Sequence, residues 1–170
     1  MVDLPETFPD TVPDVSGYVV FCDDIRHEAN GKMILIGAYL GGLRAPDFPI
    51  QVRSFGALIH YFERIGTETE PVTIRLYMPG DDDTAAAQFV IPQDWRAQPS
   101  FPDTDFIPRF HTVYVPIVIG PLVLKQKGYV RVLATVGDRT IRLGVLRVER
   151  APQPAEFPTP SQNEVAPPTP

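Results

Sequence analysis

Residues 18–40 read YVVFCDDIRHEANGKMILIGAYL and carry the signature of a β-hairpin. Two apolar runs, residues 18–22 and 33–39, flank a polar stretch that closes with Asn30-Gly31. An Asn-Gly pair between strand-like segments predicts a two-residue type I′ turn, because both central residues must adopt positive φ. The turn sets the pairing of the two segments, and the predicted opposed pairs are Asp24 with Gly37, Arg26 with Leu35 and Glu28 with Met33.

One face of the first predicted strand carries charges of alternating sign, from Asp24, Arg26 and Glu28. Side chains two positions apart on a strand share a face, so opposite charges there support one another. The stripe predicts either a structural ladder of ion pairs, which would protect an edge strand from aggregation, or a polar binding surface. The structural interpretation is favoured, and these three residues are the candidate binding residues.

A second hairpin pattern ends the globular part, where Gly137-Asp138 predicts another two-residue turn. The predicted opposed pairs are Val136 with Arg139, Ala134 with Ile141, Val132 with Leu143 and Val130 with Val145. A register shift of one residue would scatter the apolar side chains over both faces. The predicted buried face therefore consists of Val130, Val132, Ala134, Ile141, Leu143 and Val145.

The rest of the chain also has period two, and no stretch keeps a helical pattern for three turns. Further strands are predicted at residues 54–64, 72–78, 86–91, 110–119 and 122–124. Pro116 implies an edge strand or a bulge, and one helical turn at 93–98 and an irregular loop at 99–108 are expected. About eight or nine strands predict an all-β fold, an antiparallel β-sandwich that is either immunoglobulin-like or C2-like.

The chain of 170 residues suits one domain, and its twenty prolines are concentrated towards both ends. Residues 1–15 and 151–170 are predicted to be disordered arms, acidic and proline-containing at the start and proline-rich at the end, around a β-sandwich at 16–150. The net charge of −6 belongs to the arms, because residues 16–150 contain fifteen basic and fifteen acidic side chains. A neutral core with acidic arms argues against binding nucleic acid or anionic membranes.

The acidic run Asp81-Asp82-Asp83 suggests calcium, with Asp23, Asp24, Asp103 and Asp105 as further oxygen donors. However, a Pro-Gly-Asp run is also ordinary turn chemistry, and no repeated Asp-x-Asp spacing supports a metal. These aspartates are therefore weak candidates, and no metal site is assigned.

No constellation for catalysis or for a cofactor is recognisable. His27, His60 and His111 lack the paired spacing of a zinc site. Cys22 lies in an apolar strand and is predicted to be a small buried hydrophobic residue. The sequence contains neither a phosphate-binding glycine loop nor a Gly-x-Ser-x-Gly nucleophile elbow. No cofactor and no small-molecule ligand are predicted.

Two surfaces suggest partners. Residues 33–39 and 113–124 are apolar on both faces, so a protein partner or a second copy of the chain is expected to cover them. A basic group on the outer face of the last hairpin, either a solvated face or an anion-binding patch, consists of Lys125, Lys127, Arg131 and Arg142. The lone cysteine, with no leader and no membrane-spanning run, predicts a cytoplasmic protein.

The opening motif resembles that of an uncharacterised bacterial family that is known only as a domain of unknown function. The resemblance is specific over about the first twenty-five residues of the core. Its matching residues are Phe21-Cys22-Asp23-Asp24-Ile25-Arg26, Glu28, Gly31-Lys32, Leu35-Ile36-Gly37 and Tyr39. It implies a small, cytoplasmic, mostly β protein and supplies no activity, cofactor or catalytic residue.

The function most consistent with these patterns is a non-enzymatic binding or scaffolding module of a bacterial cytoplasmic protein. Two alternatives stay open, namely an enzyme built from loops, either a hydrolase or metal-dependent, and a calcium- or anion-responsive adaptor. A convergent pocket would favour an enzyme, whereas an exposed apolar face would favour a binding module.

Overall fold

The computed structural model of the protein describes residues 13–66, 70–81, 83–92 and 110–152. These residues form an all-β fold without a helix, as the period-two pattern predicted, but with twelve strands where eight or nine were expected. The three-residue strands at 43–45 and 50–52 are too short to show an alternating pattern and were not predicted. The strands are β1 (Val15–Cys22), β2 (Asp24–His27), β3 (Met33–Ile36), β4 (Leu43–Ala45), β5 (Ile50–Val52), β6 (Phe55–Arg64), β7 (Val72–Tyr77), β8 (Ala87–Ile91), β9 (Phe110–Ile119), β10 (Leu122–Leu124), β11 (Gly128–Val136) and β12 (Arg139–Arg150). The predicted helical turn at 93–98, the loop at 99–108 and most of both arms lie outside the described residues.

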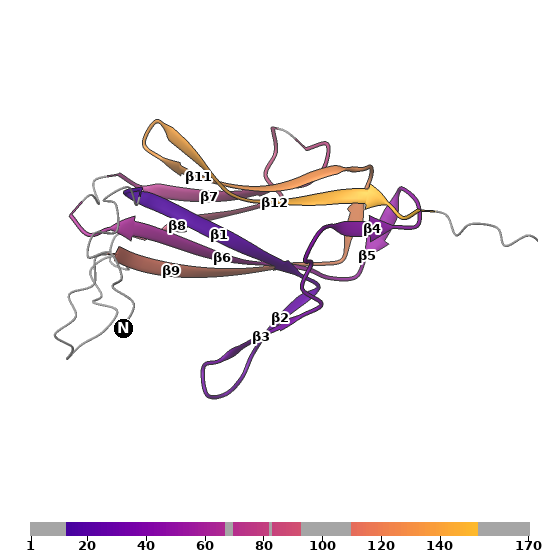
Figure 1. Ribbon diagram of the computed structural model, residues 1–170, viewed down its shortest axis with the longest axis horizontal. Coiled ribbons are helices and arrows are strands. Elements are labelled where there is room, and N and C mark those ends of the chain that lie inside the picture. The colour runs from indigo at the N-terminus through magenta and orange to yellow at the C-terminus, as the bar shows by residue number, and fades with distance from the viewer. Residues whose placement is uncertain (1–12, 67–69, 82, 93–109, 153–170) are drawn as a thin grey trace, which may run out of the picture.

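Two larger sheets pack against each other around one apolar core (Figure 1). One has the strand order β1-β6-β9 and the other β4-β12-β11-β7-β8, while β10-β5 and β2-β3 form separate two-stranded sheets. Among the described strands β9 pairs with β6 alone, which agrees with the edge position that Pro116 predicted. The pair β4 with β12 is parallel, which the expected antiparallel arrangement did not include.

The core forms because alternate side chains of each strand face the opposite sheet. On β7 the inward residues Val72, Ile74 and Leu76 are fully buried, and the residues between them are only partly buried. Ile59 and Tyr61 of β6 face them from the smaller sheet and belong to the same cluster. On β7 the alternation in the sequence therefore identifies the core residues correctly.

The two large sheets approach closely where β1 packs against β12. A Cβ atom at Gly17 would lie 2.4 Å from the main-chain oxygen of His60 and 2.9 Å from Leu143. A Cβ atom at Gly144 would lie 2.7 Å from the Cβ of Val19. Glycine at both positions therefore permits the contact between these strands.

The predicted register of the last hairpin is correct only near its turn. Val136 pairs with Arg139 and Ala134 with Ile141, but an irregularity between Val132 and Leu133 moves the later pairs by one residue. A β-bulge places two residues of one strand opposite one residue of the other, and the faces of that strand exchange beyond it. The corrected pairs are Val132 with Gly144 and Val130 with Leu146, and Val145, predicted to be buried, is 42% exposed.

The predicted register of the first hairpin is also wrong by one residue. The structure pairs Asp24 with Ile36, Arg26 with Ile34 and His27 with Met33. The Glu28 N–H donates to the Lys32 carbonyl (2.9 Å), and the Gly31 N–H donates to the Glu28 carbonyl (3.0 Å), so the loop has three residues. Three-residue loops also place glycine at positive φ, which explains why the Asn-Gly signal suggested the shorter turn.

Gly17→Ala tests the close packing of β1. The new methyl group would collide with the main chain of β6, which cannot move without disturbing the sheet, so we expect the free energy of unfolding to fall by about 1–3 kcal/mol. Urea denaturation measures the change. Gly41→Ala is the matched control, because nothing lies within 4 Å of a Cβ atom there. An equal loss in both variants would contradict the packing explanation.

Candidate functional site

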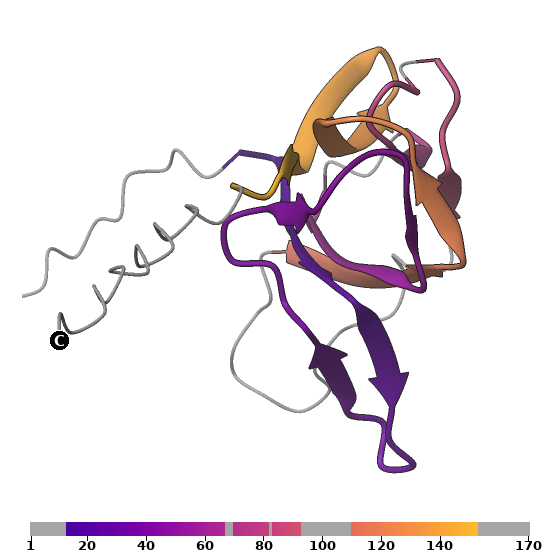
Figure 2. The same ribbon diagram turned by 90° about the vertical axis from the view of Figure 1, so that its right-hand side faces the viewer.

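The chain leaves the smaller sheet at Asp23, and the following hairpin β2-β3 projects from the body of the protein (Figures 1 and 2). Up to Cys22 the chain is β1, paired with β6, and from Asp24 it is β2, paired with β3. Two main-chain hydrogen bonds of 2.8 Å close the base of the hairpin, from the Asp23 N–H to the Ile36 carbonyl and from the Tyr39 N–H to the Phe21 carbonyl. The apolar run at 18–22 thus pairs with β6 and not with residues 33–39.

Asp23, Gly37 and Tyr39 form a polar knot at this base. The Tyr39 hydroxyl donates a hydrogen bond to Oδ1 of Asp23. Gly37 has a φ of 65°, and a Cβ atom there would lie 2.0 Å from Oδ2 of Asp23. Glycine is therefore favoured at position 37 for two reasons: it adopts the left-handed backbone without strain, and it leaves room for the Asp23 carboxylate.

The aromatic ring of Tyr39 attaches the knot to the core. It stacks on Phe55 with ring centroids 6.2 Å apart, and Phe55 lies 6.0 Å from Phe21. Partial burial raises the pKa of the Tyr39 phenol, and the hydrogen bond to Asp23 and the charge of Asp23 raise it further. The phenol is therefore a hydrogen-bond donor at neutral pH.

Beside the knot lies a surface cavity of about 550 Å³, lined by Asp23, Asp24, Arg26, Val52, Arg53 and Ser54. Its carboxylates are already engaged: Oδ1 of Asp24 accepts from the Ile25 N–H (2.9 Å), and Oδ2 accepts from Nε of Arg26 (3.1 Å). With two acidic and two basic side chains the lining is electrically balanced. The cavity is therefore a polar recess whose two carboxylates already accept hydrogen bonds from other groups of the protein.

The structure brings together only part of the predicted stripe. Asp24 and Arg26 form an ion pair at the cavity, while Glu28 lies at the tip, where its Oε2 accepts from Nδ2 of Asn30 (2.9 Å). An ion pair this exposed contributes about 0–1 kcal/mol to stability. Asp23 was expected only as a weak calcium ligand, and no role was predicted for Gly37, Tyr39 or Arg53, although Asp23, Gly37 and Tyr39 all belong to the opening motif.

The inner face of the hairpin covers part of the smaller sheet. Ile25 and Leu35 pack against Cys22 and Leu58 in a small apolar cluster. Cys22 is fully buried, as predicted, and burial raises the pKa of its thiol, with Asp23 adding to the shift. A buried thiol of raised pKa is a poor nucleophile.

On the outer face of the same sheet the rings of Tyr18, His60 and Tyr114 form one row across three strands. Tyr18 stacks on His60 with centroids 4.3 Å apart, and Tyr114 meets His60 edge-on at 4.7 Å. Burial lowers the pKa of His60, because the neighbouring rings displace water from the charged imidazolium. This row of rings lies on the surface of the sheet. Because its pKa is lowered, His60 is neutral at physiological pH.

The predicted metal candidates do not assemble within the described residues. Oδ1 of Asp81 lies 4.0 Å from Nζ of Lys125, Asp83 is exposed, and Asp82 is outside the described residues, as are Asp103 and Asp105. No group of three or more His, Cys, Asp or Glu side chains that could hold a metal occurs in the described part of the chain. In the same part no helix is long and apolar enough to cross a membrane.

Fold and site define an all-β protein with a projecting hairpin whose base is tied by an aspartate, a glycine and a tyrosine. A family model matches residues 17–149, and the chain belongs to that family, a family of unknown function (DUF6941). No curated protein matches the chain. No solved structure matches it either.

Gly37→Ala tests the knot at the hairpin base. The added methyl group would displace the Asp23 carboxylate, so we expect faster amide hydrogen exchange throughout β2 and β3. Gly31→Ala is the control, because its φ of 83° imposes similar backbone strain, on the order of 1–2 kcal/mol, while nothing lies within 4 Å of its Cβ position. Equal acceleration of exchange in both variants would show that backbone strain alone, and not the carboxylate, explains the effect.

His60 predicts a pH dependence of stability. Because its pKa is lowered in the folded state from the ordinary histidine value of about 6.5, the unfolded chain binds protons more strongly. Its contribution to the free energy of unfolding is therefore complete above that pH and is lost as the pH falls below it. We expect His60→Gln to reduce the decrease in urea stability that the wild type shows as the pH falls below that value. His27→Gln, at an exposed position, should keep the wild-type slope, and a wild-type slope in His60→Gln would refute the prediction.

Proposed function

We propose that the protein is a non-enzymatic binding module that docks another protein on the apolar surface around its projecting hairpin. We further propose that it works in the bacterial cytoplasm, as the family resemblance and the single reduced cysteine indicate. The observation that carries the proposal is the exposure of large apolar side chains on this side of the molecule. We call them the outer apolar surface: Ile34 and Ile36 of the hairpin, and Tyr18, Tyr114 and Val118 of the smaller sheet.

The side chains of the outer apolar surface are exposed to solvent although they are apolar. Ile34 and Ile36 are 43% and 37% exposed, and Tyr18 and Tyr114 about half. Both isoleucines lie on the face of the hairpin that also carries Asp24 and Arg26, because opposed residues of an antiparallel pair share a face. Apolar side chains beside a polar margin are the arrangement of a protein-binding interface.

The edge of β3 supports the same proposal. Among the described strands β3 pairs with β2 alone. Charges of β2 protect that strand, whereas the four residues of β3 are all apolar and include no charge or proline. Natural proteins usually protect such edges, so an unprotected one is suited to contact with a partner. The carboxylates of the recess already accept hydrogen bonds from Tyr39, Ile25 and Arg26, which offers less support for an enzyme.

Substitution of the two isoleucines tests the proposal. Ile34→Ser with Ile36→Ser should leave stability within about 0.5 kcal/mol, because both side chains are exposed. We expect the full-length variant to lose the proteins that the wild type retains in quantitative affinity purification, and to lose any self-association seen by sedimentation equilibrium.

The control variant is Val90→Ser with Val123→Ser, which removes two similarly exposed valines from other strands. It should retain the wild-type partners and mass. The proposal fails if the hairpin variant keeps every partner and the wild-type mass, or if the control variant loses the same ones.

A further inference from the structure

The outer face of the smaller sheet carries a straight row of aromatic rings. Tyr18 of β1 lies opposite His60 of β6, and His60 lies opposite Tyr114 of β9. Opposed residues of antiparallel strands share a face, so the three rings cross the sheet at right angles to its strands. We call Tyr18, His60 and Tyr114 the ring row. Tyr18 and Tyr114, at its two ends, are 48% and 51% exposed.

The ring row is uncharged, and its rings hold one another in place. Tyr18 stacks on His60 with centroids 4.3 Å apart, and Tyr114 meets the other side of His60 edge-on. Phe62, two residues along β6, supports Tyr18 from 5.9 Å. Burial lowers the pKa of His60, so its imidazole is neutral at physiological pH. Such a surface binds apolar groups at a low cost in side-chain entropy.

The length of the ring row matches one turn of a polyproline helix. Neighbouring strands are about 4.8 Å apart, so Tyr18 and Tyr114, two strands apart, are separated by about 9.6 Å. A polyproline II helix has about three residues per turn and rises about 3.1 Å per residue, so positions i and i+3 lie on one side about 9.3 Å apart. Aromatic surfaces recognise Pro-x-x-Pro segments in this form. A segment that crosses the strands can therefore place one proline on each terminal ring.

The chain itself contains a segment of this kind. Residues 167–170 read Pro-Pro-Thr-Pro, with Pro167 and Pro170 three positions apart. They lie outside the described residues and follow β12, beyond which the Ala151 N–H donates to the Ala45 carbonyl (2.7 Å). The chain that leads to the segment therefore starts from a fixed point of the fold.

The connecting chain is long enough to bring the segment to the ring row. Gly17 of β1 packs beside Leu143 of β12, eight residues before Ala151. The ring row is therefore about 25 Å from Ala151 along the sheets and about 10 Å through them. The fifteen residues between Ala151 and Pro167 span up to about 50 Å in polyproline form. Among the described strands β1 pairs with β6 alone, so the chain has an edge to pass around.

We propose that residues 167–170 bind the ring row of the same chain, with Pro167 on Tyr18 and Pro170 on Tyr114. The segment arrives over the edge of β1, which brings Pro167 to the nearer ring. The phenol hydroxyls donate hydrogen bonds to carbonyl groups of the segment, because a polyproline helix has no internal hydrogen bonds. The inference rests on the proposed function, since it regulates the same outer apolar surface: a partner that uses Tyr18 and Tyr114 must displace the segment.

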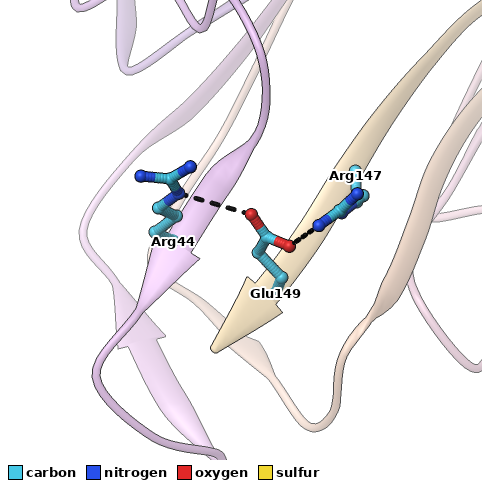
Figure 3. A network of polar contacts seen from close by, with 3 residues as sticks. All are labelled: Arg44, Arg147 and Glu149. Carbon is cyan, nitrogen blue, oxygen red and sulfur yellow. Dashed lines mark hydrogen bonds and ion pairs between the residues drawn. The ribbon is translucent and has the colours of Figure 1, made fainter. Parts of the chain in front are cut away.

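Single-stranded nucleic acid also stacks on rows of aromatic rings, but the charges of this face favour the proline segment. Nucleic acid needs a basic groove beside the rings. The strands that carry the terminal rings, β1 and β9, contain no Lys or Arg. Arg44 and Arg147 lie on the larger sheet, where both donate to the carboxylate of Glu149 (Figure 3). The strands at the two ends of the ring row therefore supply no cation to a phosphate backbone.

Titration with a synthetic peptide of residues 161–170, followed by the NMR signals of the ring row, tests the proposal. The receptor variant is the full-length protein with Pro167→Ser, Pro168→Ser and Pro170→Ser, whose own segment no longer competes. It should bind the peptide several-fold more tightly than the wild type does, because an attached segment competes at an effective concentration on the order of millimolar. Equal binding by the two proteins would contradict the proposal, and thermal unfolding checks that both are folded.

Matched substitutions locate the contact. In the receptor variant Tyr114→Ser should weaken peptide binding about fivefold, as the loss of an aromatic anchor does. Tyr129→Ser removes a tyrosine of similar exposure (56%) from the larger sheet and should leave the affinity within about twofold. In the peptide, Pro170→Ala should weaken binding, whereas Pro168→Ala, between the two contact positions, should have a smaller effect.

The proposal is overturned if the peptide does not bind, if Tyr114→Ser behaves as Tyr129→Ser, or if a ten-nucleotide oligothymidine binds the ring row more tightly than the peptide. It is also overturned if sedimentation equilibrium shows wild-type association that the receptor variant lacks, because the segment would then bind a second copy. These measurements contain no partner and leave Ile34 and Ile36 unchanged. The inference can therefore fail while the proposed function stands.

Discussion

One extra residue in β12 determines which side chains of this strand face the core and which face the solvent. Before the bulge the buried residue is Leu143, and beyond it Leu146 and Val148 are buried. Because side chains alternate along a strand, this insertion exchanges the faces of all later residues. The inner face stays apolar along the whole strand, and Arg147 and Glu149 reach the outer face beside Arg44. With an unbroken register Arg147 would face the core.

The bulge also marks the limit of what the sequence predicts about the fold. Period-two alternation predicts the all-β class correctly, although it does not reveal the short strands β4 and β5. It also contains a signal for the bulge, because apolar residues at positions 141 and 143 are followed by apolar residues at 146 and 148. Gly144, at the change of phase, is a residue that bulges favour. The turn at Gly137 is predicted correctly, but the strand pairing that it sets was extended beyond the bulge. In the first hairpin, two-residue and three-residue loops both satisfy Asn30-Gly31, so the turn chemistry could not decide the register.

The site is less predictable than the fold because it depends on a non-local choice. The segment 18–22 could pair with residues 33–39 nearby or with β6 more than thirty residues away, and the structure shows the second pairing. That choice makes the chain turn out of the sheet at Asp23 and brings Gly37 and Tyr39 to it. The alternating charges pointed to Asp24 and Arg26, which the structure places together at the recess. Asp23 was expected only as a weak calcium ligand, whereas in the structure it accepts a hydrogen bond from a tyrosine sixteen residues later.

The opening motif of the sequence therefore builds the base of the projecting hairpin. Asp23, Gly37 and Tyr39 hold the base of the hairpin, and the ring of Tyr39 ties that base to Phe55 in the core. The residues that we propose for binding lie elsewhere, on β3 and on the outer face of the smaller sheet. Ile34 is exposed and lies on the face of the hairpin opposite to Ile25 and Leu35, which pack against Cys22 and Leu58. The side chains that fix the base of the hairpin are therefore different from those proposed to contact a partner, so the two properties can be changed separately by substitution.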